Sequence, residues 1–280
     1  MPAMSETPDI ETPETILRRF AIQHLETDVP NGISVMSMPV ADLVNPLTKG
    51  PAIGALAILL DASGGNSNHF RRASDEWTVT SELALEISPD GMAVLLASPD
   101  LPVIASSRPL GPKGATALSM ATLAVGDVVI GGGTVRSFYL PAGAGMPTGL
   151  PTPAPPSPRA PLAELMSIGE LSGAAMKQEA ALRQLVDPIL NNSLGIVNGG
   201  VASAGLELVA SAAINAGAAA GDLLQTASLR VNFLRPFFAG GASRYVGSPM
   251  RVGRRTAVGD AEAIGDDGKV ALTARVTAYR

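Results

Sequence analysis

The chain has 280 residues, enough for one large domain or for two domains of about 130 residues that each bury a core. Its 20 lysines and arginines against 25 aspartates and glutamates give a net charge of −5 with no basic stripe, which excludes nucleic acid as a partner. There is no cysteine, which excludes disulfides and thiol nucleophiles, and the acidic start MPAMSETPDIETPET is unlike a signal peptide, so we expect a cytoplasmic protein.

The N-terminal part of the chain predicts a strand, one long helix and then more strands. GISVMSMPV (32–40) alternates as a half-buried strand does, and it precedes the apolar run NPLTKGPAIGALAILLDASGG (45–65), which predicts a helix. WTVTSELALEIS (77–88) is typical of a strand. Residues 110–140 predict two further strands joined by a turn that contains glycine and aspartate.

A proline-rich stretch follows at residues 145–161, GMPTGLPTPAPPSPRAP. Its composition predicts an extended, semi-rigid connector without secondary structure of its own. The sequence therefore predicts an N-terminal domain over 15–144 and a C-terminal domain over 162–280.

The C-terminal part repeats the order of the N-terminal part. NSLGIVNGGVASAGLELVASAAI (192–214) corresponds to the first helix, TASLRVNFLRP (226–236) to the strand after it, and 252–279 to the last two strands. Asp61 lies 146 residues before Glu207, and Leu83 lies 146 residues before Leu229. This constant separation indicates an internal duplication.

The central helix of each half is apolar on all sides. The run 199–221 is about as long as a membrane span, but its many alanines and glycines together with Glu207 and Asn215 favour a helix buried in a protein core, so we expect no membrane partner. The sequence predicts an α+β fold in which each half is a curved antiparallel sheet wrapped round one long central helix.

The residues that open the second helix resemble a known family. The spacing is carried by Asn192, Gly195, Asn198, Gly199, Gly200 and Glu207. It is similar to the signature of the hotdog-fold acyl-CoA thioesterases of the phenylacetate-pathway type, strongly over 175–280 and more weakly over 33–140. The resemblance implies a tandem double hotdog. Asn198 stands where the family usually has His, and KGPAIG in the N-terminal half contains an apparent one-residue insertion.

Thioester hydrolysis needs a group that stabilises an oxyanion and a group that activates water or attacks the carbonyl. A helix N-terminus opened by glycine supplies the first, and a carboxylate in an apolar setting supplies the second, so Asp61 and Glu207 are the candidate acids. Gly199 and Glu207 are about 12 Å apart along one helix, too far to meet at one carbonyl. Antiparallel pairing of the two helices, as in the family's dimers, would bring each acid to the other half's helix start.

Two pseudo-equivalent sites follow, and we rank them unequally. The site that we favour combines Asp61 with Asn192, Asn198, Gly199 and Gly200. The other combines Glu207 with Asn45, Gly54 and Ser211, and its helix start is the altered KGPAIG loop. Either acid can alternatively be a structural hydrogen-bonding group between the halves.

Further residues are candidates for substrate binding. Gly65 lies in the first helix, while Lys113, Arg254 and Arg255 are candidates for the phosphates of coenzyme A, with a solvated turn as the alternative. Of the two histidines, His69 falls in the polar stretch NSNHFRRASDE, where we expect it to be solvated. No stretch has the spacing of a metal site.

The sequence thus favours an acyl-CoA thioesterase that needs no cofactor, with coenzyme A as part of the substrate. A non-catalytic acyl-CoA-binding protein stays open, as does a hotdog hydratase or dehydratase, although those relatives use a His at the helix start. Because each chain already pairs internally, we expect homo-oligomers of such pseudo-dimeric chains.

Overall fold

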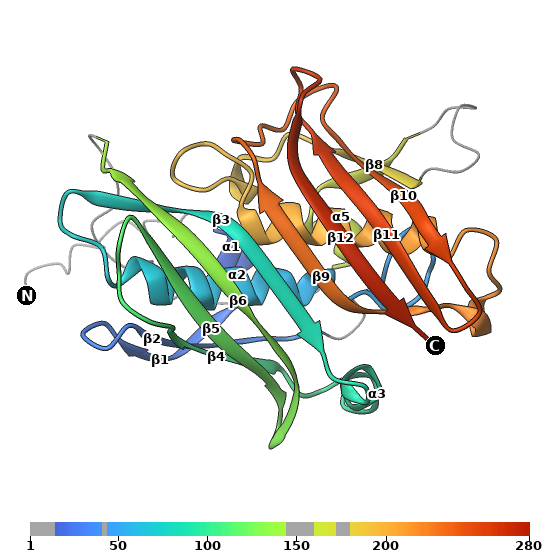
Figure 1. Ribbon diagram of the computed structural model, residues 1–280, viewed down its shortest axis with the longest axis horizontal. Helices are drawn as coiled ribbons and strands as arrows, with labels where there is room; N and C mark the ends of the chain where they lie inside the picture. Colours follow the sequence, from blue (N-terminus) through green and yellow to red (C-terminus); the bar gives the residue numbers. More distant parts are fainter. Residues whose placement is uncertain (1–14, 41–43, 144–159, 172–179) are drawn as a thin grey trace, which may run out of the picture.

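The structure is a computed structural model and describes residues 15–40, 44–143, 160–171 and 180–280 (Figure 1). Its helices are α1 (Ile16–Arg19), α2 (Gly54–His69), α3 (Gly91–Ala97), α4 (Leu162–Leu165) and α5 (Gly199–Ile214), with 3₁₀ turns η1 (Pro188–Leu190) and η2 (Ala220–Asp222). The strands are β1 (Gln23–Asp28), β2 (Ile33–Met38), β3 (Glu76–Ile87), β4 (Val103–Pro109), β5 (Thr116–Val125), β6 (Val128–Pro141), β7 (Ile168–Glu170), β8 (Ala180–Gln184), β9 (Gln225–Phe233), β10 (Arg244–Val252), β11 (Thr256–Ile264) and β12 (Val270–Tyr279).

All the strands form one antiparallel sheet of 12 strands in the order β1-β2-β4-β5-β6-β3-β9-β12-β11-β10-β8-β7. Read outward from the centre, the two halves have the same order: β3, β6, β5, β4, β2, β1 on one side and β9, β12, β11, β10, β8, β7 on the other. The halves join edge to edge through β3 and β9, where Leu83 pairs with Val231 and Leu85 with Leu229. The predicted double hotdog is confirmed.

Each half of the sheet curves round its own central helix (Figure 1). Helix α2 packs on β2 to β6 and α5 packs on β8 to β12, and the two helices also contact each other. They run antiparallel, because the start of α2 at Gly54 meets Ala204, whereas Ile58 one turn further on meets Gly200 at the start of α5. Small residues at these crossings let the two backbones come close.

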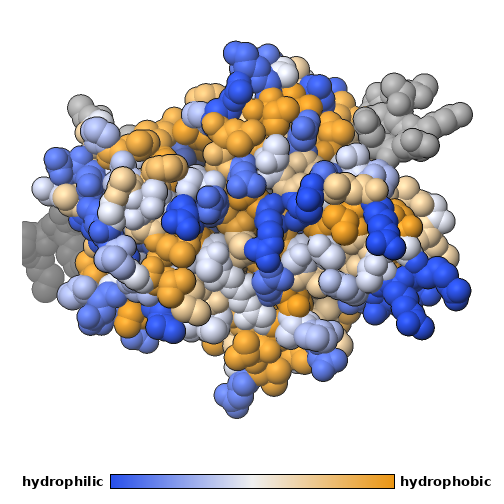
Figure 2. Space-filling model, viewed as in Figure 1, coloured by the Kyte–Doolittle hydropathy of each residue, from blue (hydrophilic) through white to orange (hydrophobic). Residues whose placement is uncertain are grey.

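The outer face of the sheet is polar at the seam between the halves. Glu86 of β3 forms an ion pair with Arg230 of β9, and Glu82 forms one with Arg136 of β6. In the view of Figure 2, hydrophilic and hydrophobic residues are interspersed over this face. These exposed pairs contribute little to stability, but they favour the observed pairing of the strands.

The sequence predicted neither the short helices α1, α3 and α4 nor the strands β1, β4, β7, β8 and β10. Most of the predicted connector 145–161 lies outside the described residues, so the domain bounds 15–144 and 162–280 stay predictions. Among the residues that the structure describes, no helix combines the length and the apolar character that are needed to cross a membrane.

Candidate active site

Asp61 lies in α2 and faces the start of the other central helix. Its Oδ2 accepts a hydrogen bond of 2.8 Å from the backbone N–H of Gly200, and its Oδ1 accepts one of 2.8 Å from the hydroxyl of Thr80 on β3. The side chain is 6% exposed. Burial raises the pKa of Asp61, and the hydrogen bonds from Thr80 and Gly200 oppose that rise by stabilising the charged form.

Helix α5 begins at a pair of glycines with different surroundings. Asn198 is the N-cap, and its side-chain oxygen accepts hydrogen bonds from the N–H groups of Gly200 at 2.9 Å and Val201 at 3.2 Å. Gly200 is buried, and a Cβ there would lie 2.7 Å from the Cα of Ile58. Gly199 is partly exposed, and within the described residues its N–H has no acceptor. This N–H is therefore available at the positive end of the helix dipole.

Some of these residues border a cavity of about 800 Å³ between the two halves. Asp61, Asn198 and Gly199 lie in its wall, together with residues of β3 and of the loop that precedes α5. The volume is in the range of small-molecule sites. A substrate in this cavity would contact both an acid and a helix N-terminus.

Asn192, the first residue of the motif, organises the loop before α5. Its side-chain oxygen accepts hydrogen bonds from the backbone N–H groups of Leu194 at 2.9 Å and Ile196 at 3.2 Å. Asn192 also lines the cavity. Its oxygen thus stabilises the turn that leads to Gly199, while the residue contributes to the cavity wall.

Glu207 repeats the arrangement of Asp61 in the opposite sense. Its Oε2 accepts a hydrogen bond of 3.2 Å from the N–H of Gly54, the first residue of α2, and its Oε1 accepts one of 2.7 Å from the hydroxyl of Thr226 on β9. Burial raises the pKa of Glu207 to about 7, against the lowering effect of both hydrogen bonds. Gly54, Asp61 and Thr80 each lie 146 residues before Gly200, Glu207 and Thr226 respectively.

The helix start beside Glu207 lacks two features of the other site. At the same separation of 146 residues, Ala52 stands where α5 has Asn198, and Ile53 stands where α5 has Gly199. Ile53 is the N-cap of α2, has no side-chain cap hydrogen bond and is 1% exposed, as is Glu207. A buried isoleucine side chain thus occupies the position that corresponds to the partly exposed Gly199.

Two other candidates of this second site are buried as well. The side-chain oxygen of Asn45 accepts hydrogen bonds from the N–H groups of Leu47 at 2.9 Å and Thr48 at 3.4 Å, and its amide donates to the carbonyl of Leu208 at 2.9 Å. Ser211 lies one turn after Glu207 in α5 and is 5% exposed. The contacts of Asn45 fasten the loop before α2 to α5.

The candidates for coenzyme A phosphates lie apart from the cavity wall. Lys113 forms an ion pair with Glu76, and its ammonium group lies 4.2 Å from the ring centroid of Tyr139. Arg254 and Arg255 are exposed in the turn between β10 and β11. The exposed cation that does line the cavity is Arg235, in the segment after β9.

The expectation that His69 is a solvated loop residue is wrong. His69 is the last residue of α2 and is half-buried, and its Nδ1 lies 2.7 Å from the hydroxyl of Thr78. Its ring meets that of Trp77 edge-on with centroids 4.7 Å apart. Burial, with a smaller contribution from Arg72, lowers the pKa of His69 to about 4, so the ring is neutral at neutral pH. His69 lines the same cavity as Asp61.

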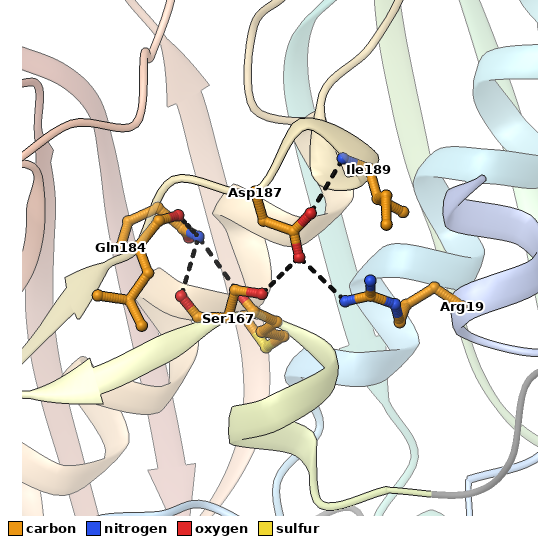
Figure 3. Close-up of polar contacts among 7 residues, drawn as sticks. Arg19, Ser167, Gln184, Asp187 and Ile189 are labelled. Atoms are coloured by element: carbon orange, nitrogen blue, oxygen red, sulfur yellow. Dashed lines mark hydrogen bonds and ion pairs between the residues drawn. The ribbon is translucent and has the colours of Figure 1, made fainter. Parts of the chain in front are cut away.

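One wall of the cavity is held by an ion pair between the two halves (Figure 3). Arg19 of α1 lies 3.0 Å from a carboxylate oxygen of Asp187, which also accepts a hydrogen bond of 2.6 Å from Ser167. The other oxygen accepts from the N–H of Ile189 at 3.0 Å, so Asp187 caps η1. Residues of α1 and η1, including Ile16 and Ile189, line the cavity.

The pairing of each acid with a threonine was missed from the sequence. Thr80 and Thr226 follow the same separation of 146 residues as Asp61 and Glu207, and this repeat was the signal that could have found them. Each threonine is on the strand of its half that lies at the seam between the halves, β3 or β9, and it bonds to the acid of the central helix in the same half.

The fold and the site define a class of protein: a double hotdog in which an acid on each central helix accepts a hydrogen bond from the first residues of the other. Residues 194–272, within the C-terminal half, match the family model of the Thioesterase superfamily. The resemblance predicted from the sequence is confirmed.

Solved structures of similar fold cover nearly the whole chain. The tesB protein of Mycobacterium avium subsp. paratuberculosis is 15% identical over 94% of this chain and 97% of its own, with a TM-score of 0.57. The acyl-CoA thioesterase II TesB2 of Mycobacterium marinum is 14% identical over 95% and 97%, also with a TM-score of 0.57. A conserved hot dog protein of Alicyclobacillus acidocaldarius is 13% identical over 94% and 97%, with a TM-score of 0.50. No curated protein sequence matches the chain.

Proposed function

We propose that this protein hydrolyses an acyl-CoA thioester in the cavity beside Asp61. The observation that carries the proposal is the meeting of a buried carboxylate from α2 with the glycine start of α5, at the wall of a cavity of about 800 Å³. The acid and the free N–H of Gly199 come from different halves, so both can face one carbonyl group.

The reaction needs a stabilised oxyanion and an activated nucleophile. The thioester carbonyl oxygen would accept a hydrogen bond from the N–H of Gly199, where the helix dipole also favours negative charge. Asp61 would take a proton from a water molecule whose oxygen bonds to the carbonyl carbon. The C–S bond then breaks, and the leaving sulfur takes that proton from Asp61, which gives the free thiol, the carboxylic acid and the original carboxylate of Asp61. Direct attack by the carboxylate of Asp61, with an anhydride that water then hydrolyses, is the alternative route.

The surroundings of Asp61 suit a base. Burial raises its pKa and so makes the carboxylate more basic than an exposed aspartate. Thr80 keeps one oxygen in place and Gly200 the other, so the carboxylate has a fixed orientation toward the cavity wall. The exposed Arg235 at the same cavity is suited to contact a phosphate of coenzyme A.

Glu207 has the same two kinds of hydrogen-bond partner, which supports a second reaction site at the start of α2. Against an equal role, Ile53 replaces the partly exposed glycine, and both Ile53 and Glu207 are only 1% exposed. We therefore propose Asp61 as the principal acid and Glu207 as an acid that mainly connects the halves. Action in the cytoplasm and assembly into homo-oligomers stay predictions.

The test is release of free thiol from a panel of acyl-CoAs by the purified protein and by two variants. Asp61→Asn keeps the shape of the side chain and removes the base, so we expect a loss of about 10²- to 10⁴-fold. Glu207→Gln serves as the matched control and should lose much less. Equal losses would indicate two working sites, whereas an unchanged rate for Asp61→Asn would contradict the assignment. A wild-type protein that binds acyl-CoA without hydrolysing it would favour the non-catalytic alternative.

A further inference from the structure

The cavity extends along one face of α2 beyond Asp61. From Asp61 onward, the residues of this helix that line it are Asp61, Ala62, Gly65, Asn66 and His69, a spacing that places them on one side of the helix. From Asp61 to His69 the helix rises about 12 Å. The cavity is therefore long enough for an extended acyl chain whose thioester end lies at Asp61.

The part of the cavity that runs along α2 from Asp61 to His69 forms a trough. Gly65 keeps the middle of this trough open. A Cβ at Gly65 would meet nothing within 4 Å, whereas a Cβ at the preceding Gly64 would lie 2.8 Å from Val135 and 3.0 Å from the hydroxyl of Ser119. Glycine thus occupies the two positions for different reasons. Gly64 lets the helix pack on the sheet, while Gly65 leaves unoccupied space on the cavity side. A helix interior favours alanine over glycine by about 1 kcal/mol, so the open position at Gly65 is not explained by the stability of the helix.

The far end of the trough has neutral hydrogen-bonding groups. His69 uses Nδ1 with the hydroxyl of Thr78, and its Nε2 has no partner among the described residues. The amide nitrogen of Asn66 has only the sulfur of Met36, at 4.0 Å, and within the described part of the chain its oxygen has no partner. Because the ring of His69 is neutral at neutral pH, this end offers hydrogen bonds without a charge.

From these three observations we infer that the acyl group lies along α2 in the trough left open by Gly65, and that its far end meets His69 and Asn66. The inference rests on the proposed function and adds the substrate class: acyl thioesters of medium length that carry an uncharged hydrogen-bonding group, such as a hydroxyl or an oxo group, toward the end of the acyl chain. A purely apolar chain would leave these polar groups without partners, which lowers its binding.

Gly65→Leu tests the position of the acyl chain. The leucine side chain would fill the trough, so kcat/KM for hexanoyl- and octanoyl-CoA should fall at least about tenfold, while that for acetyl-CoA should stay within about threefold, because hydrophobic contacts of this size contribute such factors. Gly65→Ala is the milder step and should raise the thermal stability. Gly64→Ala is the matched control: it should lower the stability without changing the order of preference among chain lengths. A fall by one factor for all chain lengths in Gly65→Leu, or no change, would overturn the inference.

The polar end is tested with a pair of substrates that differ only in a terminal hydroxyl, hexanoyl-CoA and its ω-hydroxy analogue. The wild-type protein should prefer the hydroxy compound by about tenfold, the value of one hydrogen bond, and His69→Phe should abolish that preference while keeping the ring beside Trp77. Equal kcat/KM values of the wild-type protein for both substrates would contradict the hydrogen bond between the end of the acyl chain and His69.

A separate measurement distinguishes this inference from the proposed function. If the wild-type protein hydrolyses no member of the panel, the proposed function fails. Calorimetric binding of thioether analogues, in which the sulfur is bonded to a methylene group in place of the carbonyl, then tests the trough alone. Affinity that rises with chain length in the wild type and no longer does so in Gly65→Leu supports the trough. The same length dependence in both proteins overturns it.

Discussion

Asp61 and Gly200 belong to different halves of the chain, and the N–H of Gly200 donates a hydrogen bond of 2.8 Å to Oδ2 of Asp61. The counterpart, Gly54 with Glu207, has the same partners with the halves exchanged and a distance of 3.2 Å. Both acids are buried, and each is held by one backbone N–H and one threonine hydroxyl. Neither acid would have this environment in a half that was folded alone.

The hydrogen bond from Thr80 should set the pH dependence of the reaction. It lowers the pKa of Asp61 against the effect of burial, so its removal in Thr80→Val should raise that pKa further and move the rising limb of the pH–rate profile to higher pH. Steady-state thiol release measured between about pH 5 and pH 9 checks this. Thr80→Ser should restore the profile, and Thr226→Val should leave it in place. A profile that does not move in Thr80→Val would separate this hydrogen bond from catalysis.

Glu207 should make the wild-type protein less stable as the pH rises. Its pKa is raised from 4.5 to about 7, so between these values the folded state holds a proton that the unfolded state has lost, and the free energy of unfolding decreases with increasing pH. Glu207→Gln lacks this titration. The stability of the variant relative to the wild type should therefore increase by roughly 3 kcal/mol from pH 4 to pH 8.

Urea unfolding of both proteins at the two ends of that range gives the difference directly, since other titrating groups are common to both. A constant difference would mean that the pKa of Glu207 is the same in the folded and the unfolded state.

The two glycines at the start of α5 should respond differently to alanine. In Gly200→Ala the new Cβ would lie 2.7 Å from the Cα of Ile58, so the helices must separate and the protein should lose about 1 to 3 kcal/mol of stability. In Gly199→Ala the Cβ would lie 3.0 Å from Oδ2 of Asp61 and 3.2 Å from the ring of Phe233. We expect a small change in stability and a loss of at least about tenfold in kcat, because the carboxylate is displaced. Thermal unfolding should thus separate the two variants, whereas kcat should fall in both, because the N–H of Gly200 also holds the carboxylate of Asp61.

The ion pair between Arg19 and Asp187 should position one wall of the cavity. Burial alone would raise the pKa of Asp187, but the hydrogen bonds from Ser167 and Ile189 and the contact with Arg19 together lower it. Asp187→Asn removes the charge and should cost about 1 to 3 kcal/mol of stability at neutral pH. Because α1 and η1 line the cavity, KM should rise more than kcat falls.

The cost of Asp187→Asn should shrink as the pH falls through the lowered pKa, since the wild-type carboxylate then loses its own charge. Ser167→Ala removes one hydrogen bond and keeps the ion pair. It should therefore also lower the stability and raise KM, but by less than Asp187→Asn does. A rise in KM without any loss of stability would show that the wall does not depend on this pair.

The sequence predicted the fold because the duplication preserves register over long distances. The separation of 146 residues relates the acids, the helix-start glycines and the strands at the seam of the two halves. The same separation therefore gives the counterpart of each of these residues in the other half. The apolar helices and alternating strands fit a single architecture, in which each acid has to face the other half.

The helical structure and the burial of the part of α2 after Asp61 could not be predicted from this repeat. The polar and glycine-rich stretch 63–69 has the composition of a loop, yet Ser63, Ser67 and Asn68 are buried. Their side chains bond to other parts of the sheet and its turns, for example Asn68 to the carbonyl of Val135 at 2.9 Å. Such long-range partners stabilise a helix against its local propensity, and they carry no periodic signal in the sequence.

Joining the two copies in one chain has a consequence for how they diverge. In a dimer of identical single domains, replacing the glycine that opens the helix would change both sites at once. Here Ile53 occupies that position in the N-terminal copy, whereas Gly199 remains in the C-terminal copy. The copy with the altered helix start still supplies Asp61 to the unaltered one. On this assignment the fusion lets one copy specialise as the donor of the acid and the other as the donor of the helix N-terminus, a division of labour that a symmetric ancestor could not evolve.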